Sequence, residues 1–76
     1  MTNPNMIDRT VVNNKYVVST VRLPLIFDGE EFETMVFHCD EQGTVTDWLE
    51  LDCRRYHSVE AARDGHNDVV LDFLTK

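Results

Sequence analysis

Three runs of strand-type residues followed by one helical stretch limit the possible folds of this chain most narrowly. The runs cover residues 16–27, 32–39 and 45–54, and two turn signals separate them, Asp28-Gly29-Glu30 and Glu41-Gln42-Gly43. Connections this short join neighbouring antiparallel strands. The pattern predicts an antiparallel meander whose apolar side must be buried by another element.

The third run has the clearest strand periodicity. Its residues alternate between an apolar set and a mainly polar set: Val45, Leu49, Leu51 and Cys53 against Thr46, Trp48, Glu50, Asp52 and Arg54. Alternation with a period of two is typical of a strand with one buried face. The apolar set is therefore expected to face the interior.

A helix is expected from Ser58 to the end of the sequence. Ser58 suits an N-cap, and Glu60 places an acid in the first turn, where the helix dipole favours it. Spacings of three and four residues define an apolar stripe of Val59, Ala62, His66, Val69, Val70 and Phe73. Gly65 interrupts this helix and predicts a close approach to a strand.

These elements predict an α+β domain, a three-stranded antiparallel sheet packed on one C-terminal helix. A fourth strand is an option, because Asn13-Asn14 suits a tight hairpin turn between Thr10-Val11-Val12 and Tyr16-Val17-Val18. Residues 1–9 are polar and contain Pro4, so we expect a flexible tail there and a single small domain over residues 10–76.

Charge and hydropathy restrict the partners and the compartment. Fourteen acidic residues against seven basic ones give a net charge of −7, which disfavours direct binding of nucleic acid. No apolar run approaches the roughly 18 residues of a membrane span, and the N-terminus does not resemble a signal peptide. We expect a cytoplasmic protein with Cys39 and Cys53 as reduced thiols, and a single bridge stays open if their strands pair.

The side chains with catalytic or metal-binding potential do not form a recognisable motif. His38, Cys39, Cys53 and His57 are zinc-type ligands, but adjacent strand residues such as His38 and Cys39 point to opposite faces. A nucleophile pair of Cys53 with His57 or His66 lacks a marked oxyanion donor. We expect no enzyme activity, no metal and no cofactor, and we expect His66 to bond a strand carbonyl at the edge of the core, or else to contact a partner.

The first two strand runs carry apolar residues on both faces, whereas one helix covers only one of them. The uncovered face is expected to be an apolar patch through which the chain forms a homo-oligomer. The alternative is that the sheet curls and the N-terminal segment folds over that face.

Four blocks of residues resemble a group of small proteins encoded by phages and prophages of actinobacteria. They are Ser19-Thr20-Val21-x-Leu23, Phe32-Glu33-Thr34-Met35-Val36-Phe37, Arg55-Tyr56-x-Ser58 and Glu60-Ala61-Ala62-x-x-Gly65-His66. The resemblance covers about residues 18–72 and departs from the group's pattern between Leu23 and Phe32 and between His38 and Cys53. It implies a phage origin and an accessory role, and it carries over no catalytic residue.

The acidic residues suggest how such a protein could act. Helical acids four residues apart rise about 6 Å, comparable to successive phosphates of a nucleic-acid strand. We therefore expect a non-enzymatic inhibitor of a basic host protein, comparable in size and charge to anti-CRISPR and other anti-defence proteins. The expected partner-binding residues are Glu60, Asp64, Asp68 and Asp72 on the helix and Asp28, Glu30, Glu31 and Glu33 near the turn. The alternatives are a solvated helix face and an oligomeric accessory or small-ligand-binding protein.

Overall fold

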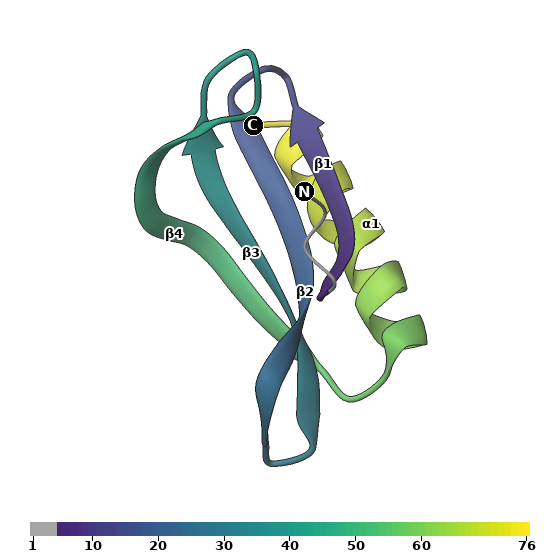
Figure 1. Ribbon diagram of the computed structural model, residues 1–76. Coiled ribbons are helices and arrows are strands. Elements are labelled where there is room, and N and C mark those ends of the chain that lie inside the picture. Colours follow the sequence, from purple (N-terminus) through teal and green to yellow (C-terminus); the bar gives the residue numbers. More distant parts are fainter. Residues whose placement is uncertain (1–4) are drawn as a thin grey trace.

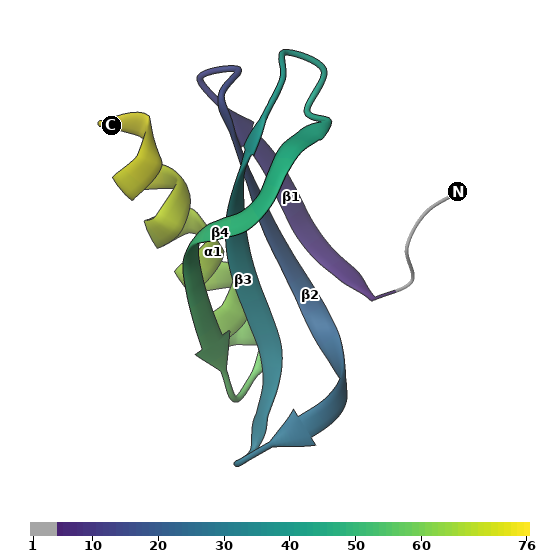
Figure 2. The same ribbon diagram turned by 90° about the vertical axis from the view of Figure 1, so that its left-hand side faces the viewer.

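The computed structural model describes residues 5–76, apart from the side chain of Phe27, and contains one sheet and one helix (Figure 1). The elements follow the order β1 (Met6–Val12), β2 (Tyr16–Phe27), β3 (Glu30–Cys39), β4 (Val45–Tyr56) and α1 (Val59–Leu74). The sheet is an antiparallel meander with strand order β1-β2-β3-β4, and α1 lies along one side of it (Figure 2). The α+β fold is confirmed, with the optional fourth strand present.

The two tight turns have the backbone conformations that their sequences favour. Asn13 and Asn14 have φ of 54° and 55°, and Lys15 N donates a hydrogen bond to Val12 O at 3.1 Å. Asp28 and Gly29 have φ of 53° and 78°. Asn, Asp and Gly tolerate these left-handed conformations best, which explains why the chain reverses at these positions.

The predicted flexible tail is wrong for residues 6–9, because β1 begins at Met6. Its pairing with β2 runs from Met6 opposite Val21 to Val12 opposite Tyr16. Arg22 N also donates to Asn5 O at 2.8 Å. Backbone pairing stabilises a polar segment as well as an apolar one, so composition alone misplaced this boundary. Residues 1–4 of the predicted tail lie outside the described part.

The core lies between α1 and the inner face of the sheet. The buried helix residues are Ala62, Gly65, His66, Val69 and Phe73. They face a layer of strand residues that includes the buried side chains of Val12, Val18 and Val36. Ser58 caps the helix as predicted, since its hydroxyl accepts a hydrogen bond from Ala61 N at 3.1 Å.

The opposite face of the sheet is partly closed by the chain itself. Val17 points to that face, yet it is only 1% exposed. The β3–β4 turn approaches β1, where a Cβ on Gly43 would lie 2.9 Å from the side chain of Val11 and where Arg9 donates to Gly43 O. Because the β3–β4 turn reaches β1, it covers part of this face and reduces the broad apolar patch expected there.

Gly65 allows α1 to pack directly on the last residue of β4. A Cβ at this position would overlap the side chain of Tyr56, both its ring and its Oη. The expected close approach of Gly65 to a strand is confirmed. No helix within residues 5–76 is long and apolar enough to cross a membrane.

The contact between Tyr56 and Gly65 buries the hydroxyl group of Tyr56. Tyr56 Oη is buried and has no hydrogen-bond partner among the described residues. A buried hydroxyl without a partner forfeits its hydration, so Tyr56→Phe should leave the free energy of unfolding unchanged or raise it by about 1 kcal/mol. Urea denaturation followed by circular dichroism measures this change, and a loss of stability would reveal a partner for the hydroxyl.

Candidate functional site

An apolar cluster protrudes from β4 where sequence reasoning expected a regular strand. Leu49 and Leu51 are 71% and 41% exposed, and Trp48 is 73% exposed. The predicted inward orientation of Leu49 and Leu51 is wrong. We refer to Trp48, Leu49 and Leu51 as the β4 cluster.

A register shift pushes the β4 cluster out of the sheet. Val36 pairs with Asp52 and His38 pairs with Asp47, so two steps along β3 correspond to five along β4. The extra residues form a large irregular bulge, which bends the strand and re-aims its side chains. Asp47 supports the bend, because its Oδ1 accepts a hydrogen bond from Leu49 N at 3.0 Å. Figure 1 shows β4 bowing away from β3 in this region.

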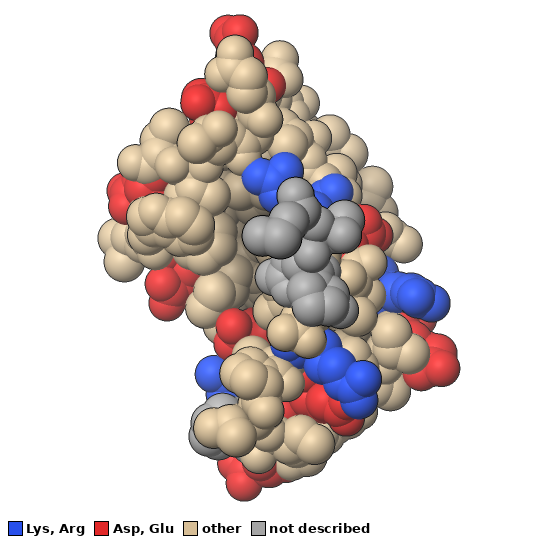
Figure 3. Space-filling view, in the orientation of Figure 1, with Lys and Arg blue, Asp and Glu red and all other residues tan. Residues whose placement is uncertain are grey.

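The β4 cluster has an aromatic support and an acidic rim. The rings of Trp48 and Phe37 meet edge to face, with centroids 5.3 Å apart and planes at 64°. Asp47 and Glu50 are exposed beside the cluster. On the left of Figure 3, where β4 bows outward, acidic side chains lie above and below an uncharged area. An apolar centre within a charged rim is the arrangement of a protein interface.

The helical acids predicted as partner-binding residues are all exposed, but they are not equivalent. Asp72 forms an ion pair with Arg54 at 2.9 Å. Glu60, Asp64 and Asp68 have no basic side chain within ion-pair distance among residues 5–76. These three carboxylates form a row on the solvent side of α1, which we call the helix row.

The acids near the β2–β3 turn are divided between exposed and internal positions. Glu33 is 7% exposed and accepts a hydrogen bond from Arg55 Nε at 2.9 Å, so its carboxylate is engaged within the protein. Glu31 pairs with Arg22 and is half-buried, as is Glu30, whereas Asp28 is exposed. Buried acids require a basic partner, and the sequence does not show which acids become buried.

The β2–β3 turn, which carries two of these acids, contacts the segment that leads into α1. A Cβ on Gly29 would lie 3.2 Å from Nδ1 of His57, the residue that precedes the N-cap of α1. Asp28 and Glu30 flank this contact, and Glu60 lies in the first helical turn. The acids of the β2–β3 turn therefore lie near the segment that leads into the helix.

The two thiols are separate and are not activated. Cys39 pairs with Val45 and Cys53 pairs with Met35, and both cysteines are free. Burial raises the pKa of each thiol, and neighbouring acids, Asp40 at Cys39 and Glu33 at Cys53, raise it further. Thiolates are the reactive form, so these environments oppose nucleophilic chemistry at either cysteine. Within residues 5–76 no group of three or more His, Cys, Asp or Glu side chains could hold a metal ion.

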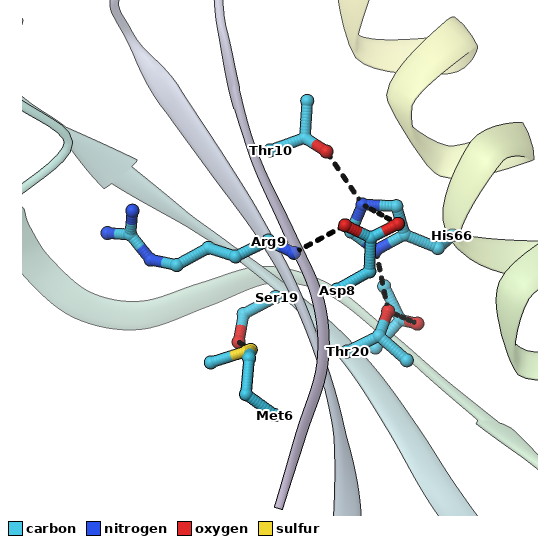
Figure 4. Close-up of polar contacts among 8 residues, drawn as sticks. Met6, Asp8, Arg9, Thr10, Ser19, Thr20 and His66 are labelled. Carbon is cyan, nitrogen blue, oxygen red and sulfur yellow. Dashed lines mark hydrogen bonds and ion pairs between the residues drawn. The ribbon is translucent and has the colours of Figure 1, made fainter. Parts of the chain in front are cut away.

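His66 joins the helix to the sheet through hydroxyl groups rather than the expected strand carbonyl. Nε2 lies 2.9 Å from Thr10 Oγ1, and Nδ1 lies 2.7 Å from Thr20 Oγ1 (Figure 4). Thr20 in turn shares a hydrogen bond with Thr34. Asp8 Oδ2 is 3.8 Å from Nε2, which gives an outline similar to an Asp-His-hydroxyl triad. Thr20 is 0% exposed and no substrate can reach it, so the network is structural.

The burial of His66 makes the stability of the fold depend on pH. Burial lowers its pKa below the ordinary 6.5, although Asp8 opposes the shift. The unfolded chain therefore takes up this proton more readily than the folded chain, so stability is fully present above pH 6.5 and falls as pH drops towards the folded pKa. Denaturation experiments should show the free energy of unfolding falling as the pH is lowered from 7.5 to about 5.5, and this slope reports on His66. His66→Gln should flatten it and exposed His57→Gln should not; an unchanged slope in His66→Gln would contradict the assignment.

Sequence reasoning missed the β4 cluster, although one signal was present. Trp48 and Leu49 are adjacent large apolar residues in a run that otherwise alternates, so one of them must point away from the helix-covered face in any regular strand. The structure exposes both. Comparison with known proteins found no matching family model, no matching curated protein and no matching solved structure.

Proposed function

We propose that the chain is a phage-encoded, non-enzymatic interaction protein that covers the basic surface of a host nucleic-acid-binding protein. The observation that carries this proposal is the β4 cluster, which exposes Trp48 and Leu49 by 73% and 71% beside the carboxylates of Asp47 and Glu50. Exposed tryptophan is a frequent centre of binding energy at interfaces. The resemblance of residues 18–72 to phage proteins supports the origin.

The acidic rim indicates the charge of the partner. Asp47 and Glu50 surround an apolar centre on a protein of net charge −7, so a partner with basic groups around an apolar pocket complements it. The helix row adds carboxylates that attract the same partner from a distance. Such a partner would ordinarily use its basic groups to hold phosphates.

Affinity capture from an actinobacterial host lysate tests the proposal. Tagged protein should recover a basic nucleic-acid-binding protein at low salt and much less at high salt, since screening weakens the contacts of the rim. Asp47→Lys with Glu50→Lys should abolish the recovery. Glu41→Lys changes an exposed acid in the β3–β4 turn and serves as the control. If the amount of partner recovered changes neither with salt nor in the double variant, the electrostatic part of the proposal is refuted.

The role of the helix row is tested separately. Asp64→Lys with Asp68→Lys should slow association and reduce its salt dependence, because these exposed charges act mainly at a distance. Surface plasmon resonance measures the association rate. A loss of affinity through faster dissociation alone would instead place the helix row inside the contact.

A homo-oligomer is the second candidate, and the position of the β4 cluster favours it. β4 is an edge strand of the sheet, and exposed edges with apolar side chains pair readily with a second copy. The net charge of −7 on each copy opposes this association. Light scattering at high micromolar concentration decides: a mass that rises with concentration and falls in Trp48→Ala supports the oligomer, and a constant monomer mass removes it.

A further inference from the structure

A second site lies between the end of α1 and the sheet, and it shares Leu51 with the β4 cluster. It is an open pocket of about 300 Å³, close to the lower limit of known ligand sites. β2, β3, β4 and the C-terminal end of the chain all contribute to its wall. The lining residues are Tyr16, His38, Leu51, Asp52, Phe73 and Lys76.

Aromatic rings form much of the pocket. Tyr16 and Phe73 meet edge to face, with centroids 5.1 Å apart and planes at 69°. The ring of His38 also packs near Tyr16, with centroids 5.7 Å apart. Three of the six lining residues therefore carry an aromatic ring.

The protein's own ammonium groups already lie over two of these rings. Lys76 Nζ is 5.1 Å from the centroid of Phe73, and Lys15 Nζ is 5.9 Å from the centroid of Tyr16. The negative face of an aromatic ring attracts a cation at this distance. The rings are thus positioned to bind positive charge.

Two further features add negative potential at the same place. Asp52 lines the pocket, and its carboxylate is shared with Arg54 in an ion pair at 3.1 Å. Helix α1 ends at Leu74 and has no basic residue in its last turn, so the negative end of its dipole is offset there by the Lys76 ammonium over Phe73 and is exposed when Lys76 moves away. A cation in the pocket would lie near the carboxylate, the ring faces and the helix end.

From this convergence we infer that the pocket is a binding site for an organic cation, an alkylammonium or guanidinium group, with Lys76 as its displaceable occupant. The ligand's source is either a small amine or a Lys or Arg side chain of a partner protein. The inference does not depend on the proposed function, because it concerns the charge and shape of the pocket alone.

Choline and its uncharged isostere 3,3-dimethylbutan-1-ol provide a matched pair of probes. In NMR titrations of the full chain, choline should shift the signals of Tyr16, Phe73 and Lys76 saturably. The isostere has the same shape without the charge, so it should bind at least about threefold more weakly. Equal binding of the two probes, or no shift at these residues, would overturn the inference.

Three variants test the assigned roles. Lys76→Met removes the competing ammonium group and should tighten choline binding about threefold, whereas Asp52→Asn should weaken it about threefold. Glu60→Gln makes the same charge change at the opposite end of α1 and should leave binding unaltered. If Glu60→Gln weakens binding as much as Asp52→Asn, the effect is general attraction by an acidic protein and the site is refuted. The two-dimensional spectrum of each variant verifies its fold.

A third probe separates the two sources of the cation. N-acetyl-lysine amide presents a lysine side chain without a free α-amino group. Saturable shifts with this probe at the same residues support a partner side chain as the ligand, and shifts with choline alone support a small alkylated amine. Both outcomes support a cation site, and binding by neither probe contradicts it.

Discussion

Replacing Gly65 with alanine should destabilise the fold by about 2 kcal/mol, because overpacking at a tight contact costs more than the helix gains. The added Cβ would overlap the Tyr56 ring, and Tyr56 is held at the end of β4 by its pairing with Phe32. Alanine is otherwise the better helix residue by about 1 kcal/mol, so the sign of the change reports directly on the contact.

Two comparisons isolate the cause of the Gly65→Ala effect. Asn67→Ala, at an exposed site of the same helix, should raise stability slightly, since it improves helix propensity without a new contact. In a Tyr56→Ala background the ring is absent, and Gly65→Ala should no longer destabilise. Urea denaturation of the unaltered protein, Gly65→Ala, Tyr56→Ala and the double variant gives the coupling energy between the two positions. An equal cost in both backgrounds would show that Gly65 does not serve to admit Tyr56.

Truncating the β4 cluster should cause the largest loss of function. Trp48→Ala with Leu49→Ala is expected to weaken binding of the captured partner by at least about 30-fold, as for the central residues of other interfaces. Both side chains are more than 70% exposed, so the free energy of unfolding should fall by no more than about 1 kcal/mol. Calorimetry of the purified pair measures the affinity.

The helix supplies a matched control for this double variant. Leu71 is 62% exposed and lies on α1, away from β4, so Leu71→Ala removes a comparable apolar group without touching the cluster. Its affinity for the partner should equal that of the unaltered protein. A loss of binding in Leu71→Ala equal to that of the double variant would show that apolar surface in general, rather than the β4 cluster, drives the association.

The sequence was most informative where the causes of structure are local. The Ser58 cap, the apolar stripe of α1 and the Asn13-Asn14 turn depend on a few neighbouring residues, and all three were predictable. Gly65 was readable for a related reason, since glycine inside a strong helix usually marks a close contact. Together these local features indicate the α+β fold class.

The features that define the candidate site depend on pairing between distant residues. The register shift between Val36–Asp52 and His38–Asp47 is a property of two strands together, so alternation within β4 could not reveal it. The same holds for the burial of Glu33, which follows from Arg55 on the neighbouring strand. Composition also concealed β1, because pairing with β2 stabilises its backbone whatever its side chains.

The most direct test of the central claim is competition for the captured partner. A fluorescently labelled nucleic acid bound to that partner is titrated with this protein, and anisotropy follows its release. We expect complete displacement by the unaltered protein and by Leu71→Ala, and little displacement by Trp48→Ala with Leu49→Ala. Simultaneous binding of the protein and the nucleic acid to the partner would contradict the claim that the protein covers its basic surface.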